Sequence, residues 1–352
     1  MNKQTIIPLT PPLLSFDHIK EKTPCIRAHR ERLFRIEYQY VNGKHLFHNY
    51  GHGGAGWTFL FGAVNTSLEQ FDQCMAQNHS LKKSPIAVIG AGCYGLLTAI
   101  SLAQRGLNVG IIAKHTQDIP SYKAAGFFFP RARKSSTPQE RAVFHATGMH
   151  SYTQYLSIAQ GTHPFITAGA QILPAYYGLD IDPEFAPYIQ KGLMAAPQRV
   201  TVDFNNGKRF EAMQYMVPFM NTTMLMTELE ELRKKLGIPI IQRDIADFEE
   251  LNESIIFNCA GLGAKELAHD ARIIPVQGHL ITLKNQPPLP YMINAKVIQK
   301  NPAGNPRDEL IYFAPKDEGI LGITFIRGQA DASANAHEFE RLLERCRNFF
   351  GT

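Results

Sequence analysis

The feature that most constrains the fold is a glycine pattern set between two short apolar segments. Residues 86–95 read Ile-Ala-Val-Ile-Gly-Ala-Gly-Cys-Tyr-Gly, so three glycines follow an apolar strand directly, in the spacing G-x-G-x-x-G. A helix is predicted over 94–105, Gly106 ends it, and a second strand is predicted over 109–113. Two strands joined by a short helical crossover run parallel. The sequence therefore predicts an α/β protein built around a parallel sheet.

Each glycine of this pattern has a separate physical task. Gly90 permits the tight turn, Gly92 lets the backbone approach a pyrophosphate, and Gly95 lets the helix pack closely on the strand. The N-terminus of the helix adds partial positive charge. The pattern predicts a Rossmann-like dinucleotide site. The next strand ends in Ala113-Lys114-His115, without the acidic residue that usually holds the ribose, so the identity of the dinucleotide, NADP included, stays open at this point.

The remaining elements follow from periodicity and turn residues. Residues 1–30 are rich in proline and are predicted to be irregular. Asn42-Gly43 suits the positive φ angles of a hairpin turn. Residues 279–326 contain four predicted strands without an intervening helix, so those strands should be antiparallel. The other predicted elements are strands over 33–40, 45–48, 238–242 and 254–258, a polar linker over 78–84, and helices over 55–77, 138–159, 223–236 (with a threonine N-cap) and 334–350.

Charge and cysteine usage narrow the class of partners and the compartment. The chain has 36 Lys and Arg against 31 Asp and Glu, and the basic residues form no long block, so nucleic acid is not an expected partner. With 44% apolar and 19% charged residues, the composition is that of a folded chain. No run of about 18 apolar residues occurs, so no membrane span is predicted. The five scattered cysteines favour a reducing, cytoplasmic location, and the absence of a recurring ligand spacing predicts no metal.

Further segments resemble the D-amino-acid oxidase family of FAD-dependent oxidoreductases, which includes D-aspartate oxidase. Residues 121–130, Ser-Tyr-Lys-Ala-Ala-Gly-Phe-Phe-Phe-Pro, are similar to the family's Ala-Ala-Gly segment, which lies along the flavin. Residues 241–250 and 256–261 resemble its adenine-contact strand and its Asn-Cys-Thr-Gly turn. Residues 48–58, His-Asn-Tyr-Gly-His-Gly-Gly-Ala-Gly-Trp-Thr, match the family's closing motif almost word for word, and they are the most specific signal in the chain.

The order of these motifs differs from the family order. The closing motif normally follows the glycine pattern and the substrate domain, but here it precedes the glycine pattern by about forty positions. Residues 25–30, similar to the family's Arg-Pro-x-Arg segment, precede the closing motif in the usual relative order. The resemblance therefore implies a circular permutant of the D-amino-acid oxidase fold. Residues 1–80 would be the usual C-terminal part, and Met1 and Thr352 should lie near each other.

The implied fold combines two domains. The first is a Rossmann-like FAD-binding domain with a parallel sheet, assigned to residues 45–134 and 221–285. The second is a substrate-binding domain with an antiparallel sheet, assigned to residues 1–44, 135–220 and 286–352. In this arrangement the front of the chain completes the flavin site and is not a dispensable extension.

The resemblance also implies the residues of the site, with FAD bound without a covalent link. Arg27 would anchor the substrate carboxylate, because a guanidinium fork pairs a carboxylate bidentately; a surface arginine is the alternative. Gly54 would lie at the reacting centre, and Tyr215 would line the substrate pocket or else the core. His48 and His52 are expected to hydrogen-bond backbone beside the cofactor, more than to act as acid–base groups or metal ligands. The expected FAD contacts are Gly53, Gly54, Ala55, Gly56, Trp57, Thr58, Gly90, Ala91, Gly92, Cys93, Tyr94, Gly95, Lys114, His115, Ser121, Ala125, Gly126 and Ile245.

The function implied by the resemblance is the oxidation of a D-amino acid by an FAD-dependent oxidoreductase. Hydride passes from the α-carbon to the flavin, the imino acid hydrolyses to a keto acid and ammonia, and oxygen is reduced to hydrogen peroxide. One alternative is a glycine or sarcosine oxidase-like amine dehydrogenase with another electron acceptor. A second alternative is a flavin-binding protein without turnover, because the residues around Tyr215 match the family poorly. The expected partners are a small amino acid and oxygen, and a homodimer is left open.

Overall fold

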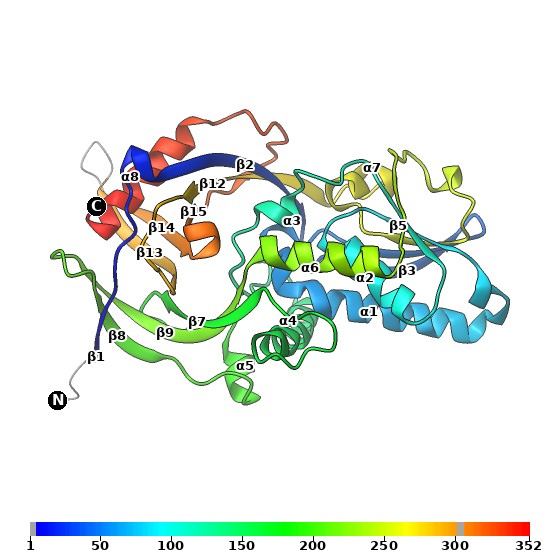
Figure 1. The fold of residues 1–352 in the computed structure, drawn as a ribbon, viewed down its shortest axis with the longest axis horizontal. Coiled ribbons are helices and arrows are strands. Elements are labelled where there is room, and N and C mark those ends of the chain that lie inside the picture. The colour runs from blue at the N-terminus through cyan, green and yellow to red at the C-terminus, as the bar shows by residue number, and fades with distance from the viewer. Residues whose placement is uncertain (1–4, 301–305) are drawn as a thin grey trace.

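The computed structural model describes residues 5–300 and 306–352, which form two β-sheets with helices packed against them (Figure 1). The smaller sheet lies in the right half of Figure 1, and its strands follow the order β10-β6-β5-β11-β4-β3. Neighbouring strands run parallel except β3 and β4, which are antiparallel. The strands are β3 (Arg35–Val41), β4 (Lys44–Tyr50), β5 (Ile86–Ile89), β6 (Val109–Ala113), β10 (Ile240–Gln242) and β11 (Ile255–Asn258).

The central strands of this sheet are buried on both faces. β5 and β11 consist of Ile-Ala-Val-Ile and Ile-Ile-Phe-Asn, and all their residues are buried. Val88 and Phe257 share an apolar cluster with helices α1 (Gly56–Gln77), α2 (Cys93–Gln104) and α6 (Thr222–Lys235). Ala87 and Ile256 belong to a second cluster, which contains Leu267 of α7 (Ala264–Leu267) and residues next to the 3-10 helix η4 (Phe248–Glu250). Because both faces are covered, these strands are continuously apolar instead of alternating.

The glycine pattern lies in the predicted βαβ unit. β5 and β6 pair in parallel, and α2 connects them. The hairpin of β3 and β4 turns at Asn42 and Gly43, whose φ angles of 50° and 78° are those that the Asn-Gly pair favours. The α/β class, the parallel sheet and the hairpin are therefore confirmed.

The larger sheet is mainly antiparallel and lies in the left half of Figure 1. Its strands follow the order β1-β8-β9-β7-β13-β14-β15-β12-β16, and β2 pairs with β12 beside this path. The predicted strands over 279–326 pair antiparallel with one another, but β13 also pairs in parallel with β7. The strands are β1 (Thr5–Pro8), β2 (Ile19–Arg30), β7 (Ala170–Tyr177), β8 (Gln198–Asp203), β9 (Arg209–Met220), β12 (Ile273–Leu283), β13 (Met292–Lys300), β14 (Pro306–Ala314), β15 (Ile320–Gly322) and β16 (Ile326–Arg327).

The prediction that residues 1–30 are irregular is wrong. This segment forms β1 and the twelve-residue strand β2, which pairs with β12 along its length. Pro24 lies in the middle of β2 opposite His279. A proline is tolerated there because β2 has a strand neighbour on one side only, so a position without an N–H group can face away from the ladder. The high proline content of this segment is therefore compatible with an edge strand and does not require an irregular loop.

Helices connect and cover the two sheets. Helix α4 (Pro138–Ala159) matches its prediction and begins with a capping box between Thr137 and Glu140. It crosses α1 so closely that a methyl group at Gly62 would lie 2.1 Å from the carbonyl oxygen of Thr147. The predicted threonine N-cap of α6 is wrong, because Asn221 precedes the helix and accepts a hydrogen bond from the Met224 N–H group. The remaining α-helices of the described chain are α3 (Pro120–Lys123), α5 (Ala186–Gln190) and α8 (His337–Phe350), and the predicted linker contains the 3-10 turn η3 (His79–Lys83).

The beginning and the end of the described chain attach to the same part of the larger sheet. β1 pairs with β8, and Asn206, just after β8, donates to the Phe350 carbonyl at 2.8 Å. Arg347 of α8 donates to the Leu14 carbonyl at 2.6 and 2.8 Å. Met1, for which proximity to Thr352 is predicted, lies outside the described residues. None of the helices in the described part of the chain is both long and apolar enough to cross a bilayer.

Candidate active site

The glycine pattern forms an open cradle at the carboxyl end of β5. Gly90 has a φ angle of 108°, and a methyl group there would lie 2.5 Å from the Cys259 carbonyl oxygen. A methyl group at Gly95 would lie 1.8 Å from the Gly90 carbonyl oxygen, so packing excludes a side chain at both positions. Among the described residues beyond its chain neighbours, a methyl group at Gly92 would have only Ser121 Oγ within 4 Å, at 3.0 Å. Gly92, the N-cap residue of α2, provides no side-chain cap, so the first-turn N–H groups after that of Cys93 can meet an anion.

Ser121 connects this cradle to the segment that follows β6. Its hydroxyl accepts a hydrogen bond from the Cys93 N–H group at 3.1 Å, and its carbonyl accepts one from Trp57 Nε1 at 3.0 Å. Cys93 is buried, and burial raises the pKa of its thiol to about 11, so the thiol stays protonated at neutral pH. Cys93 therefore contributes its backbone and not a thiolate.

The glycine loop after β4 reaches the same cradle. Tyr94 of the phosphate loop donates from its hydroxyl to the Gly56 carbonyl at 2.7 Å, and its ring stacks on His52 at 4.0 Å. Gly53 has a φ angle of 64°, and α1 begins at Gly56 without a side-chain cap. The N-terminus of α1 therefore lies against the first turn of α2, and both ends carry partial positive charge. The structure brings these two predicted loops together although they are separate in sequence.

The segment 124–126 is held from the larger sheet. The Gly126 carbonyl accepts from the Met220 N–H group at 2.7 Å, and a methyl group at Gly126 would lie 1.7 Å from the Met220 carbonyl oxygen. The Ala124 carbonyl accepts from Thr222 Oγ1 at 2.7 Å and from Lys316 Nζ at 3.1 Å. Lys316 is only 2% exposed, and burial lowers the pKa of its ammonium group. Sequence reasoning missed Lys316, because a lysine in a turn between two strands has the pattern of a surface residue.

Arg27 is buried next to Gly54. It lies on β2 and is 8% exposed, and its Nη1 donates to the Thr324 carbonyl at 2.9 Å. The other terminal nitrogen, Nη2, is buried without a hydrogen-bond partner among the described residues. A methyl group at Gly54 would lie 3.4 Å from Arg27 Cδ, so the arginine stem lies beside the glycine loop. A buried guanidinium with a free donor fits a carboxylate ligand, and a surface role for Arg27 is inconsistent with this burial.

Gly278 makes room for the Arg27 side chain. A methyl group at Gly278 would lie 1.8 Å from Nη2 of Arg27 and 2.3 Å from Cζ. The next residue, His279, has its Nδ1 atom 2.6 Å from Thr324 Oγ1, and this contact holds the loop that binds Arg27. Phe325 in the same loop is 60% exposed, and its ring lies 5.1 Å from Arg27 Cζ. Gly278 and Thr324 were not predicted, because their roles depend on the pairing of β2 with β12.

Aromatic side chains lie beyond Arg27. Tyr312 is close enough for the positive charge of Arg27 to lower the pKa of its phenol, but burial has the larger effect and raises that pKa. The rings of Tyr312 and Phe127 lie 5.3 Å apart, and those of Phe127 and Tyr177 lie 5.7 Å apart. The Tyr177 hydroxyl is buried without a hydrogen-bond partner among the described residues. Tyr312, Phe127 and Tyr177 thus form one aromatic series that begins near Arg27.

Tyr215 has the contacts of a core residue. It is 1% exposed, and its hydroxyl accepts a hydrogen bond from the Asp182 N–H group at 3.0 Å. Its ring packs against Phe185 at 4.9 Å and Tyr177 at 5.1 Å. Of the two interpretations of Tyr215, pocket and core, these contacts favour the core.

The histidines of the closing motif are buried and neutral. His48 Nδ1 lies 3.3 Å from Asn258 Nδ2, and Nε2 lies 3.2 Å from Gln39 Oε1, so its partners are side chains and not the expected backbone groups. Burial lowers the pKa of His48 to about 3, and burial together with the nearby Arg133 lowers the pKa of His52 well below its ordinary value. Within the described ranges, no three His, Cys, Asp or Glu side chains are grouped to hold a metal ion.

The predicted adenosine end is more exposed. Lys114 Nζ lies 2.6 Å from Asp244 Oδ2, and both side chains are about 60% exposed. Asp244 follows β10, the neighbour of β6, so a carboxylate lies at this edge although β6 itself does not end in one. His115 is exposed, and Ile245 packs in the cluster that contains Ala87, Ile89 and Ile256.

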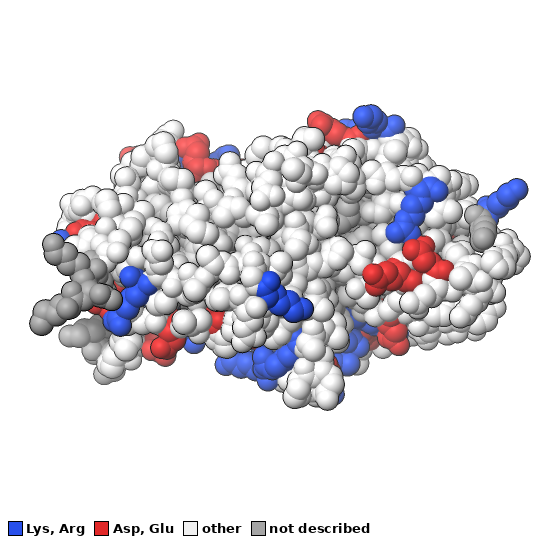
Figure 2. Space-filling view, turned by 90° about the horizontal axis from the view of Figure 1, so that it is seen from below, with Lys and Arg blue, Asp and Glu red and all other residues white. Residues whose placement is uncertain are grey.

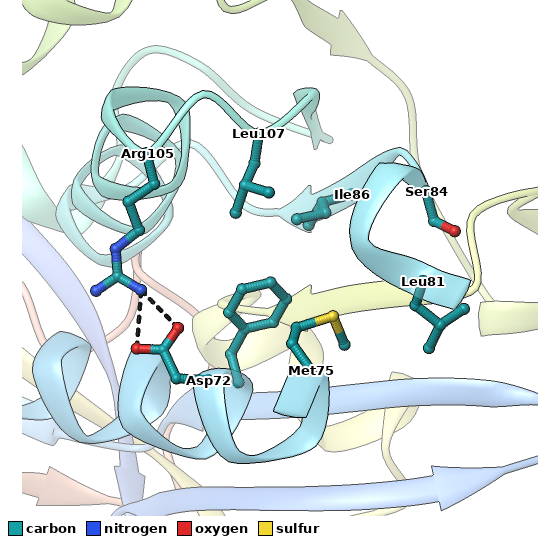
Figure 3. A pocket seen from close by; sticks show the side chains of 8 residues that line it. Asp72, Met75, Leu81, Ser84, Ile86, Arg105 and Leu107 are labelled. Carbon is teal, nitrogen blue, oxygen red and sulfur yellow. Dashed lines mark hydrogen bonds and ion pairs between the residues drawn. The ribbon is translucent and has the colours of Figure 1, made fainter. Parts of the chain in front are cut away.

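A hollow of about 350 Å³ lies at the opposite end of the parallel strands (Figure 3). It is bordered by the end of α1, the turn η3, the start of β5 and the segment between α2 and β6, and Arg105 and Asp72 form an ion pair of 2.9 Å beside it. The glycine loops follow the carboxyl ends of β4 and β5, which is where α/β sheets bind their ligands. The hollow is therefore separate from the candidate active site.

Two neighbouring helix N-termini at the glycine loops, with a buried arginine on the adjoining sheet, are typical of a dinucleotide-binding protein of two-sheet architecture. The sequence model of the FAD dependent oxidoreductase (DAO) family matches residues 85–352. The chain belongs to this family, it is an FAD-dependent oxidoreductase, and the NADP alternative falls away.

Relatives with assigned activities cover about three quarters of the chain. A D-amino-acid oxidase of Rubrobacter xylanophilus is 23% identical over 74% of this chain and 75% of its own length. A D-aspartate oxidase of Homo sapiens is 28% identical over 74% of each chain. Among solved structures, iminodiacetate oxidase of Chelativorans sp. BNC1 superposes with a TM-score of 0.54 at 15% identity, covering 76% of this chain and 79% of that one. That likeness supports the fold.

Proposed function

We propose that this protein oxidises a D-amino acid at the α-carbon, with oxygen as the electron acceptor. The observation that carries the proposal is the buried guanidinium of Arg27, which lies beside Gly54 and keeps Nη2 free of partners among the described residues. A carboxylate is the ligand that such a fork pairs with best. The similarity to a D-amino-acid oxidase and a D-aspartate oxidase supports an amino acid as the owner of that carboxylate.

The residues present fit FAD. A side chain is excluded at Gly90 and Gly95, while Gly92 is open except for Ser121, which is the shape of a pyrophosphate cradle. We propose that Gly90 to Gly95 and Ser121 hold the pyrophosphate, that Ala125 and Gly126 lie along the cofactor, and that Gly53 to Thr58 meet its flavin end. Lys114, His115 and Ile245 would border the adenosine. Bound FAD supplies a hydride acceptor and returns the electrons to oxygen.

The protein contributes orientation to this reaction. Arg27 would fix the carboxylate, so that the α-carbon takes one position relative to the glycine loop. The bond from Arg27 to the Thr324 carbonyl limits rotation of the guanidinium, and the contact of His279 with Thr324 limits movement of that carbonyl. Phe127, which is buried, and Tyr312, which is partly buried, provide an apolar wall on one side. We propose Tyr177 and Tyr312 as lining residues in place of Tyr215.

In the glycine or sarcosine oxidase-like alternative, the substrate would differ from a D-amino acid in the groups attached to its amine nitrogen and its α-carbon. The structural likeness to iminodiacetate oxidase shows a shared fold at 15% identity, so it does not favour a secondary amine as substrate here. The match to the FAD dependent oxidoreductase family model supports an enzyme over a protein without turnover.

We also propose the circular permutation and the two-domain division. Residues 1–84 precede the part matched by the family model, yet β4 lies between β11 and β3, and β2 pairs with β12. These positions support a front segment that is integral to both sheets. The sheets suggest moving β3 to the FAD-binding domain and β12 to the substrate-binding domain, relative to the boundaries at 44 and 285. A cytoplasmic location and a homodimer stay predictions.

The test of the proposed function is a substrate panel. Purified protein should be yellow and should release FAD on acid precipitation. Anaerobic addition of a D-amino-acid mixture should bleach the flavin absorbance, and air should restore it with release of hydrogen peroxide. L-enantiomers provide the matched control, and glycine, sarcosine and iminodiacetate test the alternative. Bleaching by the amines but by none of the D-amino acids would replace the proposal with that alternative.

A further inference from the structure

Arg133 is a second buried arginine beside the glycine loop, and the proposed function does not use it. One of its terminal nitrogens, Nη2, donates to the His52 carbonyl at 2.8 Å and to the Gly51 carbonyl at 3.4 Å. Its Nε atom is buried without a hydrogen-bond partner among the described residues. The guanidinium also lies 5.6 Å from the ring centre of Phe144. Arg133 therefore holds the loop by hydrogen bonds to two neutral carbonyl groups.

The positive charge of Arg133 lacks a compensating carboxylate. No ion pair within 4.0 Å involves Arg133 in the part of the chain that the structure describes, whereas the nearby Arg131 pairs with Asp182 and Arg327 pairs with Glu31. Burial lowers the pKa of Arg133 to about 10; Tyr94 opposes this shift and the charge of Arg327 adds to it. The guanidinium is thus charged at neutral pH, and a buried charge without a counter-ion is costly. Proteins commonly retain such an uncompensated buried charge at sites where it interacts with a ligand.

The charge lies close to the backbone that faces the cofactor region. A methyl group at Gly53 would lie 3.2 Å from Nη2 of Arg133, so the guanidinium nearly contacts the glycine that precedes Gly54. Helix α1 begins three residues after Gly53, at Gly56, and has no side-chain cap. The helix N-terminus and Arg133 therefore add their positive potentials on one loop.

We propose that Arg133 is a positioning residue that makes the glycine loop electropositive, holding Gly51 and His52 and compensating the negative charge that FAD gains on reduction. The inference rests on FAD dependence, not on the D-amino-acid substrate, so it can fail or succeed independently of the proposed function. If Arg133 only held the loop in place, its replacement would alter stability and FAD affinity but leave the reduction potential unchanged.

The test uses the FAD-loaded protein and three variants. Arg133→Gln keeps hydrogen-bonding capacity but removes the charge, Arg133→Lys keeps the charge without the fork, and Arg131→Gln is the matched control at an exposed arginine two positions away. The dissociation constant of FAD is measured by fluorescence quenching. The midpoint potential is measured by dye-coupled reduction, and the affinity for sulfite is measured by loss of flavin absorbance, because sulfite addition also places negative charge on the flavin.

Arg133→Gln should shift the midpoint potential to more negative values and weaken sulfite binding at least tenfold. Arg133→Lys should recover most of both, and Arg131→Gln should match the unmodified protein. Unchanged potential and sulfite affinity in an FAD-loaded Arg133→Gln protein would overturn the proposal. If Arg133→Gln does not retain FAD, Arg133→Lys decides: sulfite affinity near that of the unmodified protein supports the role of charge, and a tenfold loss contradicts it.

Discussion

Replacing Gly278 by alanine tests whether Arg27 anchors the substrate. The added methyl group would lie 1.8 Å from Nη2, 2.3 Å from Cζ and 2.6 Å from Nη1 of Arg27, all well inside contact distance. To relieve these overlaps, the guanidinium must move by roughly 1.5 Å. This movement breaks its 2.9 Å hydrogen bond to the Thr324 carbonyl and misaligns the two terminal nitrogens with a carboxylate. A hydrogen bond to a charged group contributes about 1.5–3 kcal/mol. This corresponds to an increase of about 10- to 150-fold in KM for the D-amino acid.

The variant changes none of the residues expected to contact FAD, because Gly278 lies on β12. Alanine also fits the backbone there, because Gly278 does not adopt a positive φ angle. We therefore expect unchanged FAD affinity and a loss concentrated in KM and in the binding of a non-oxidisable carboxylate. Gly178→Ala is the matched control, since a methyl group there meets no atom within 4 Å. The reasoning is refuted if a folded, FAD-loaded Gly278→Ala protein keeps the KM of the unmodified protein, because the guanidinium would then not be the anchor.

Three further predictions concern the anchor, pH and chain order. Arg27→Ala should keep FAD but lose about 3 kcal/mol of substrate binding, roughly 150-fold in KM, and Arg27→Lys should recover only part; unchanged kinetics in both would reassign the anchor. His48 has a folded pKa of about 3, below its ordinary 6.5, so the unfolded chain binds the proton better. The contribution of neutral His48 to the free energy of unfolding is complete above pH 6.5 and falls by about 1.4 kcal/mol per pH unit below that value. Urea titrations at pH 7 and 5.5 should therefore show a smaller loss of unfolding free energy in His48→Gln than in the unmodified protein. A protein starting at Lys82 should lose FAD and solubility together, whereas residues 1–80 fused after Thr352 should give a yellow protein; FAD retention and turnover by the shortened protein would contradict the permutation.

The local parts of the site could be predicted because their chemistry is written in short segments. Gly90, Gly92 and Gly95 have separate tasks within one turn, and the Asn42-Gly43 turn needs no distant partner. The eleven residues from His48 to Thr58 form another such segment. In each case the constraint lies between residues that are neighbours in sequence.

The rest depends on contacts between distant segments. Arg133 is defined by the carbonyl groups of Gly51 and His52, Lys316 by that of Ala124, and Gly278 by the guanidinium of Arg27. None of these residues belongs to a recognisable pattern of its own. The strand β2 was missed for a related reason, since only its one-sided pairing with β12 explains why Pro24 is tolerated.

The surface agrees with the modest charge balance of the sequence. Figure 2 shows acidic and basic side chains dispersed among neutral ones, with one small basic cluster at its lower edge. On this face of the described chain, no continuous basic band is present.

The pairing of early strands with late ones has a consequence for how the protein reaches its folded state. The anchor contact between Arg27 and Thr324 spans 297 residues, β2 pairs with β12, and β4 pairs with β11. During synthesis at about 5–20 residues per second, the first fifty residues wait roughly 10–40 s before β11 and β12 leave the ribosome. Through that interval β2 lacks its partner β12, and β4, which can pair with β3, lacks β11 on its other edge, so both strands expose an unpaired edge that favours aggregation. Expression of this protein should therefore respond strongly to chaperones and to temperature, more than that of the reordered chain, in which these strands emerge after their partners.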